Sequence, residues 1–182
     1  MKKISLVGAG RVGESAAQIL AKEELCQELM LIGTRPGVAQ GTALDLAECA
    51  PLFGFDTAVE GSTDLTAMAD SDLVIISAGL PRKPGMSRSD VLDANAPIVA
   101  AAADTARQVA PHAILIVVTN PVDVLTHLAW TRSGFDRKRV LGLSGTLDAA
   151  RMAGFIAAAT QRLVSSCSRT SSKRFARSAS RS

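Results

Sequence analysis

A glycine-rich turn near the start of the chain is the first pattern that could do chemistry. The run Gly8-Ala9-Gly10-Arg11-Val12-Gly13 matches the spacing GxGxxG and stands between an apolar segment and a helical pattern. In that context the first glycine permits a tight turn, the second lets the backbone approach a pyrophosphate, and the third lets helix and strand pack closely. The amides at the helix start then face the phosphates. This context favours a dinucleotide site over an ordinary strand-to-helix turn.

A second informative position follows the next apolar segment. Dinucleotide folds that prefer NAD place Asp or Glu there, roughly 20 residues past the glycines, to bind the ribose hydroxyls. This sequence has Ile32-Gly33-Thr34-Arg35 at that point and no carboxylate. The missing acid removes the repulsion against a 2′-phosphate, and Arg35 could pair with one. A glycine turn with a solvated arginine explains the same residues equally well, so NAD and NADP both stay open.

Polar segments follow two later apolar runs. The loop Arg82-Lys83-Pro84-Gly85-Met86-Ser87-Arg88 carries two arginines, each of which can hold a carboxylate in bidentate fashion. Asn120, before Pro121, could hydrogen-bond a substrate hydroxyl, although Asn-Pro also commonly starts a turn. Asp148 and Arg151 share a helix face, the usual spacing of a surface ion pair. Because ligands bind beyond the carboxyl ends of strands in open α/β sheets, the first two segments are well placed for a small anion.

Apolar segments that alternate with helical patterns would position these residues. We predict strands over 3–7, 29–32, 58–61, 73–77, 114–118 and 140–143, and helices over 12–23, 42–49, 88–109, 121–132 and 146–159. In the first helix, Val12, Ala16, Ile19 and Leu20 form one apolar face. Strands separated by helices imply right-handed βαβ units and a parallel sheet. The predicted fold class is α/β, a doubly wound parallel sheet of the Rossmann type, with the strand order 3-2-1-4-5-6 by analogy.

Charge is unevenly distributed along the chain. Of the 20 basic residues, six fall within 161–182, where no residue is acidic and eight of 22 are Ser. The first 160 residues therefore carry 14 basic and 17 acidic groups, so the net charge of +3 does not indicate a nucleic-acid partner. We predict a dinucleotide-binding domain over 1–160 and a basic Ser-rich tail over 161–182, either a disordered arm or an out-of-frame end.

Cysteine spacing and hydropathy indicate the cellular location that we expect for the protein. Cys26, Cys49 and Cys167 are far apart and lack metal-ligand spacing, which favours reduced thiols, no metal site and a cytoplasmic location. No stretch approaches an uninterrupted apolar membrane span, so we expect no membrane partner.

The motifs together resemble the lactate/malate dehydrogenase family from Met1 to about Thr160. The runs that carry the resemblance are GAGRVGESAAQILA, QGTALDLAE, AGLPRKPGMSRSDVLDANAPIV, VTNPVDVLTHLAW and LGLSGTLDAARM. Within the family they are most similar to bacterial malate dehydrogenases that resemble lactate dehydrogenase. The resemblance implies reversible oxidation of malate, a small dicarboxylate, to oxaloacetate by hydride transfer to NAD, a step of the citric acid cycle. It also implies a homo-oligomer for the full-length protein.

The resemblance implies roles for individual residues. Arg82 would bind the distal carboxylate of malate, since lactate dehydrogenases usually carry Gln there, and Arg88 would polarise the substrate carbonyl. Arg151 would hold the proximal carboxylate, and Asp148 would orient the catalytic histidine. Asn120 would bind the substrate oxygen, and the cofactor would be lined by Asn95, Val118, Thr119 and Asn120. The family's Asn-Pro bond suggests that the bond between Asn120 and Pro121 is cis.

Two departures from the family pattern matter. Gly33 replaces the usual Asp, which puts strict NAD selectivity in doubt, and the Gly-Gly-His segment does not occur in the sequence. His112, in an expected turn, and His127, in an expected helix, lie outside the catalytic context. A secondary alcohol needs a base of near-neutral pKa to lose its proton. We therefore predict an inactive N-terminal fragment of a malate dehydrogenase. The alternatives are a non-catalytic dinucleotide-binding module and a protein whose basic tail binds an acidic partner.

Overall fold

The computed structural model describes residues 1–161, which divide between two compact units, one spanning Met1–Gly142 and one beginning at Leu143. The domain predicted over 1–160 therefore contributes residues to both units. The tail predicted over 161–182 lies outside the described residues except for Gln161, which follows the last helix. Among the described residues, no helix is long and apolar enough to cross a membrane.

A six-stranded parallel sheet forms the centre of the first unit. Its strands are β1 (Lys3–Val7), β2 (Glu28–Ile32), β3 (Ala58–Ser62), β4 (Leu73–Ile76), β5 (Ile114–Val117) and β6 (Val140–Gly142). The order across the sheet is β3-β2-β1-β4-β5-β6, with Ile4 of β1 opposite Leu29 on one side and Leu73 on the other. The predicted doubly wound order 3-2-1-4-5-6 is thus confirmed.

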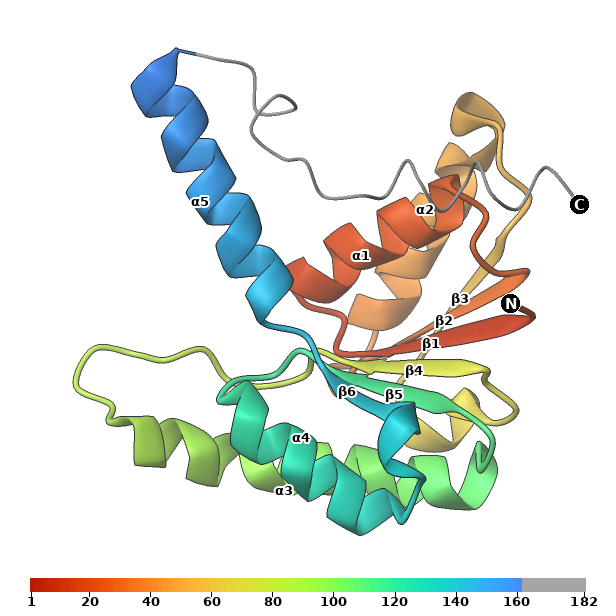
Figure 1. The fold of residues 1–182 in the computed structure, drawn as a ribbon. Coiled ribbons are helices and arrows are strands. Elements are labelled where there is room, and N and C mark those ends of the chain that lie inside the picture. The colour runs from red at the N-terminus through yellow and green to blue at the C-terminus, as the bar shows by residue number, and fades with distance from the viewer. Residues whose placement is uncertain (162–182) are drawn as a thin grey trace, which may run out of the picture. The chain divides into compact units, whose positions relative to one another are not determined.

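Helices cover both faces of this sheet, which explains why β4 (LVII) and β5 (ILIV) are apolar throughout. In Figure 1, α1 (Arg11–Lys22) and α2 (Val38–Phe53) lie on one face, and α3 (Arg88–Val109) and α4 (Val122–Ser133) lie on the other. Two short 3-10 helices, η1 (Leu65–Met68) and η2 (Arg137–Arg139), precede β4 and β6.

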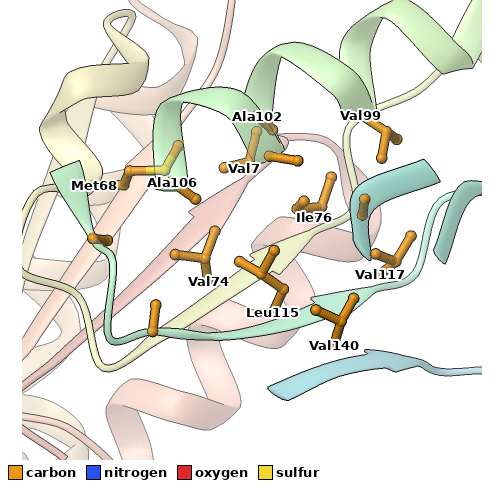
Figure 2. Close-up of a cluster of buried hydrophobic side chains, with 14 of the residues drawn as sticks. Val7, Met68, Val74, Ile76, Val99, Ala102, Ala106, Leu115, Val117 and Val140 are labelled. Atoms are coloured by element: carbon orange, nitrogen blue, oxygen red, sulfur yellow. The ribbon is translucent and has the colours of Figure 1, made fainter. Parts of the chain in front are cut away.

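Two hydrophobic clusters fill the spaces between the sheet and its helices. Under α3 and α4, the side chains of Val74, Ile76, Leu115 and Val117 are fully buried against small residues such as Ala102. Figure 2 shows this cluster, with the strand residues pointing toward α3. The second cluster, under α1 and α2, is built on alternate residues of the same strands. Burying apolar area on both faces stabilises the fold by about 25 cal/mol per Å².

The buried face of α1 differs from the predicted one. Ala16 and Leu20 pack against the core as half-buried residues, but Val12 is 59% exposed and Ile19 is 62% exposed. The fully buried positions are Gly13, Ala17 and Ala21, which are spaced four residues apart. Because these residues are small, α1 can approach the sheet more closely than a face of large side chains would allow.

Helix ends agree with the prediction for α3 and differ for α2. The 88–109 prediction matches α3, whose N-cap Ser87 forms a capping box with Asp90. The 42–49 prediction is too short because α2 continues through Pro51 and ends at Gly54, which adopts a left-handed conformation with φ of 68°. Glycine is the usual residue for that C-terminal conformation.

The second unit contributes one described helix, α5 (Gly145–Thr160). Several of its large apolar side chains are exposed, including Phe155 at 76% and Met152 at 65%. Its bounds lie within one residue of the predicted helix over 146–159.

Candidate functional site

The glycine turn joins β1 to α1 as the sequence predicts. Gly8 has φ of +120°, a conformation that side chains rarely adopt, and its N–H donates to the Ile32 carbonyl at 2.8 Å. A Cβ atom at Gly13 would lie 1.8 Å from the Gly8 carbonyl oxygen, so α1 begins in direct contact with the turn. The fold itself therefore explains glycine at both positions, whether or not a ligand binds there.

Gly10 is different, because a Cβ atom there would meet nothing within 4 Å. Gly10 is the N-cap of α1, and no side chain caps the helix, so its first amides are free of side-chain partners. Arg11, the first helical residue, is exposed. Open space beside uncapped amides at a helix start suits a phosphate group. The residues present thus fit a dinucleotide pyrophosphate at this turn.

Ser77 ties the end of β4 to the glycine turn, a role that the sequence prediction missed. The N–H groups of Ser77 and Ala78 both donate to the Val7 carbonyl at 2.8 Å. The Ser77 hydroxyl also donates to the Gly8 carbonyl at 3.2 Å. The signal in the sequence is a small hydroxyl residue directly after an apolar strand, but only the pairing of β1 with β4 places it beside Gly8.

Asn95 connects two loops at the carboxyl edge of the sheet. Its side chain is 1% exposed, and its Oδ1 accepts a hydrogen bond from the Leu80 N–H at 2.7 Å. Its Nδ2 donates to the Leu80 carbonyl at 3.3 Å and to the Asn120 carbonyl at 2.9 Å. The structure gives Asn95 the role of fixing the loops after β4 and β5. Its expected contact with a cofactor stays a prediction.

The residues after β5 divide between buried and exposed positions. The Thr119 hydroxyl is buried and donates a hydrogen bond to the Ala78 carbonyl at 2.8 Å. Gly79, which the sequence prediction also missed, leaves no room for a Cβ atom, since one would lie 2.6 Å from the Thr119 Cγ2. Val118 is half-buried and Asn120 is exposed.

The peptide bond between Asn120 and Pro121 is cis, as the resemblance implied. The Asn120 side chain, in contrast to its carbonyl, has no hydrogen-bond partner among residues 1–161. The amide of Asn120 is therefore available to a ligand at this edge.

The basic loop lies between β4 and α3. Both Arg82 and Arg88 are exposed, and within the described part of the chain neither forms an ion pair with a carboxylate. The Nε of Arg82 donates to the Met86 carbonyl at 2.8 Å, which holds the guanidinium against its own loop. The Ser87 backbone N–H donates to the Asp90 carboxylate at 2.8 Å, and this hydrogen bond lowers the pKa of Asp90. The loop and the start of α3 thus present two guanidiniums that have no carboxylate partner among residues 1–161.

The end of β2 also lies against the glycine turn. The Gly33 N–H donates to the Ser62 carbonyl at 3.0 Å, and a Cβ atom at Gly33 would lie 3.1 Å from the Ala9 Cβ. Thr34 and Arg35 follow as exposed residues. The position that carries an acid in NAD-preferring folds therefore lies against the glycine turn but bears no side chain.

Asp148 and Arg151 belong to α5 of the second unit, which is described by itself. Arg151 Nη1 lies 3.2 Å from Asp148 Oδ1, one helical turn away, and both side chains are more than half exposed. This is the surface ion pair that the spacing suggested. The substrate role of Arg151 and the orienting role of Asp148 stay predictions.

The two histidines lie away from the glycine turn. His112 is in a turn that precedes β5, at the amino end of that strand. His127 is exposed on α4, where its ring makes an edge contact with Trp130 at 5.6 Å between centroids. Neither sits at the carboxyl edge where the glycine turn, Asn95 and Asn120 meet.

Comparison with known proteins agrees with this geometry. The family model described as the NAD binding domain of lactate/malate dehydrogenase matches residues 2–142. A malate dehydrogenase of Nitrosococcus oceani is 59% identical over 160 residues, which are 88% of this chain and 51% of that protein. The chain spans about half the length of the curated relatives it matches.

Solved structures give the same result. The malate dehydrogenase of Cryptosporidium parvum superposes with a TM-score of 0.86 at 38% identity, over 90% of this chain and 52% of that one. A lactate dehydrogenase of the same organism, solved with lactic acid and β-nicotinamide adenine dinucleotide, has a TM-score of 0.84 at 34% identity over 90% and 51%. With its sheet order, its glycine turn and these matches, the chain belongs to the lactate/malate dehydrogenase family and carries that family's NAD-binding domain.

Proposed function

We propose that this chain binds a nicotinamide adenine dinucleotide at the glycine turn and derives from a malate dehydrogenase. The observation that carries the proposal is the contrast among the three glycines. A Cβ atom at Gly8 or Gly13 would clash with backbone atoms, whereas at Gly10 it would meet none of the described residues within 4 Å and would lie beside uncapped amides. A glycine that protein packing does not require is explained by a ligand that approaches the backbone closely.

When bound, the dinucleotide would supply a nicotinamide that accepts a hydride from the substrate. The residues of this chain would orient it. Asn95 and Thr119 hold the ends of β4 and β5 at fixed separation, and the first amides of α1 would bind the pyrophosphate.

The proposed substrate is malate, a dicarboxylate. Arg82 and Arg88 offer two guanidiniums without carboxylate partners among the described residues, and each can form a bidentate pair with a carboxylate group. Arg82 would bind the distal carboxylate and Arg88 would polarise the carbonyl. Asn120 would bind the substrate oxygen through its free amide. Arg151 would hold the proximal carboxylate.

Proton transfer is the step for which these 182 residues supply no suitable group. Asp148 would orient a histidine, yet the family's Gly-Gly-His segment is not in the sequence, and His112 and His127 lie elsewhere. We therefore propose that a polypeptide of these residues binds the cofactor without oxidising malate at an ordinary rate. A homo-oligomer and a cytoplasmic location remain our proposals for the full-length protein.

Calorimetric titration of the 182-residue chain with NADH and with NADPH tests the binding proposal, and a malate oxidation assay tests the catalytic one. We expect saturable binding of one dinucleotide per chain and no turnover above the uncatalysed background. A lack of saturable binding would refute the proposed function. Turnover at an ordinary dehydrogenase rate would refute the claim that no base is present.

A further inference from the structure

We propose that the dinucleotide site takes NADP at least as tightly as NAD, with the 2′-phosphate bound at Thr34 and Arg35. This inference rests on the proposed dinucleotide function and concerns the end of β2 alone. The first step is position. Gly8 donates to the Ile32 carbonyl at 2.8 Å, so the last residue of β2 is tied directly to the turn that would hold the pyrophosphate.

The second step is the lack of a side chain at the next residue. A Cβ atom at Gly33 would lie 3.1 Å from the Ala9 Cβ and 3.5 Å from the Ala39 Cβ, so this residue faces the glycine turn at contact distance. A carboxylate at this point would accept hydrogen bonds from the ribose hydroxyls of NAD and repel a 2′-phosphate. With glycine there, the NAD-specific hydrogen bonds and the repulsion are both absent.

The third step is charge. Residues 33–41 (GTRPGVAQG) contain one charged side chain, that of Arg35, and the first turn of α2 has no acidic residue. Within residues 1–161, Arg35 is exposed and forms no ion pair. Its backbone is fixed, because its carbonyl accepts a hydrogen bond from the Val38 N–H at 3.3 Å. The exposed hydroxyl of Thr34 can also donate to a phosphate oxygen.

Position and charge together favour the phosphorylated cofactor. A 2′-phosphate carries a charge near −2 and three strong acceptor oxygens, so it would gain a charge-assisted hydrogen bond from Arg35. NAD has no group that uses Arg35 in this way. If Arg35 were only solvated, removing its side chain would change the affinities for NADP⁺ and NAD⁺ equally.

Calorimetric titrations of the 182-residue chain with NADP⁺ and with NAD⁺ test the inference. We expect NADP⁺ to bind at least as tightly as NAD⁺. Arg35→Ala should weaken NADP⁺ binding by roughly tenfold, the value of one hydrogen bond to a charged group, and should change NAD⁺ binding far less. Lys138→Ala removes an exposed positive charge in η2, at the amino end of β6, and should leave both affinities unchanged.

Gly33→Asp provides a second comparison and should shift the preference toward NAD⁺. The Cβ atom that this substitution adds would press on Ala9. Arg35 is exposed, so Arg35→Ala causes no such clash and is the decisive variant. If NADP⁺ binds ten times more weakly than NAD⁺, or if Arg35→Ala weakens both cofactors equally, the inference is wrong while the proposed function stands. If neither cofactor binds, the proposed function fails first.

Discussion

Replacing Gly10 and Gly13 separately by alanine should separate two roles of the glycine turn, ligand binding at Gly10 and packing at Gly13. A Cβ atom at Gly13 would lie 1.8 Å from the Gly8 carbonyl oxygen, so α1 would have to move away by roughly 1.5 Å to reach ordinary contact. Overpacking of this kind costs about 1–3 kcal/mol, occasionally more. Because the clash is with a backbone atom, we take the upper end of that range, about 3 kcal/mol. The preference of a helix for alanine over glycine offsets about 1 kcal/mol of this cost, so we expect a net loss of about 2 kcal/mol.

The same change at Gly10 should spare the fold. Gly10 has φ of −100° and ψ of −172°, an extended conformation open to any residue, and its Cβ would meet nothing within 4 Å. Gly10→Ala should therefore lower the free energy of unfolding by only about 0.5–1 kcal/mol, the cost of replacing glycine by the poorer N-cap residue alanine. The added methyl group would occupy the space left for the pyrophosphate and should weaken NADH binding at least tenfold.

Urea unfolding and calorimetry with NADH, run on both variants, give the two readouts. We expect Gly13→Ala to lower the urea midpoint clearly, and Gly10→Ala to lower it much less while weakening NADH binding. Wild-type affinity in Gly10→Ala would show that no phosphate passes over this residue. A wild-type urea midpoint in Gly13→Ala would show that α1 does not depend on contact with the turn.

Four further predictions concern residues outside the glycine turn. Asn95→Ala should lower the free energy of unfolding by about 2–3 kcal/mol in urea titrations, because it removes a buried side chain and leaves partly buried backbone groups of two loops without partners; a loss under 0.5 kcal/mol would contradict its positioning role. Ser87→Ala should cost about 1 kcal/mol at neutral pH by the same method. Because the Ser87 N–H lowers the pKa of Asp90, the stabilisation from that carboxylate should be present above about pH 4, its unfolded pKa, and be lost as the pH falls through the lower folded pKa; Asp90→Asn, compared with the wild type from pH 7 to 2, should show a difference that disappears in acid. Burial raises the pKa of the Cys26 thiol, so Cys49, which is half-buried, should react with iodoacetamide before Cys26 does when labelling is mapped by mass spectrometry.

Much of the fold follows from the sequence because parallel strands covered on both faces must be apolar along their whole length. LVII of β4 and ILIV of β5 satisfy that requirement, and helix-sized gaps between strands imply crossover connections. The apolar face of α1 was less predictable. Periodicity detects large residues such as Val12 and Ile19, but the closest approach to the sheet selects small ones such as Gly13 and Ala17. Hydropathy cannot rank a glycine as a packing residue.

The site could be predicted from the sequence only at positions where a single physical reason explains the residue type. The spacing of Gly8, Gly10 and Gly13 after a strand is such a case, and the structure even separates their roles. Asn95 is the opposite case. An Asn within a helix has no local signature, and its bonds reach Leu80 and Asn120, which are 15 and 25 residues away. Long-range polar contacts depend on strand order, so no window of sequence reveals them.

The distribution of the proposed residues between the two units has a chemical consequence. The glycine turn, Gly33 and the loops fixed by Asn95 all belong to the unit Met1–Gly142, so the proposed cofactor site is complete within one compact body. The proposed substrate groups are divided, with the two loop arginines in that unit and Arg151 and Asp148 in the second. Cofactor binding should therefore require only the first unit to fold.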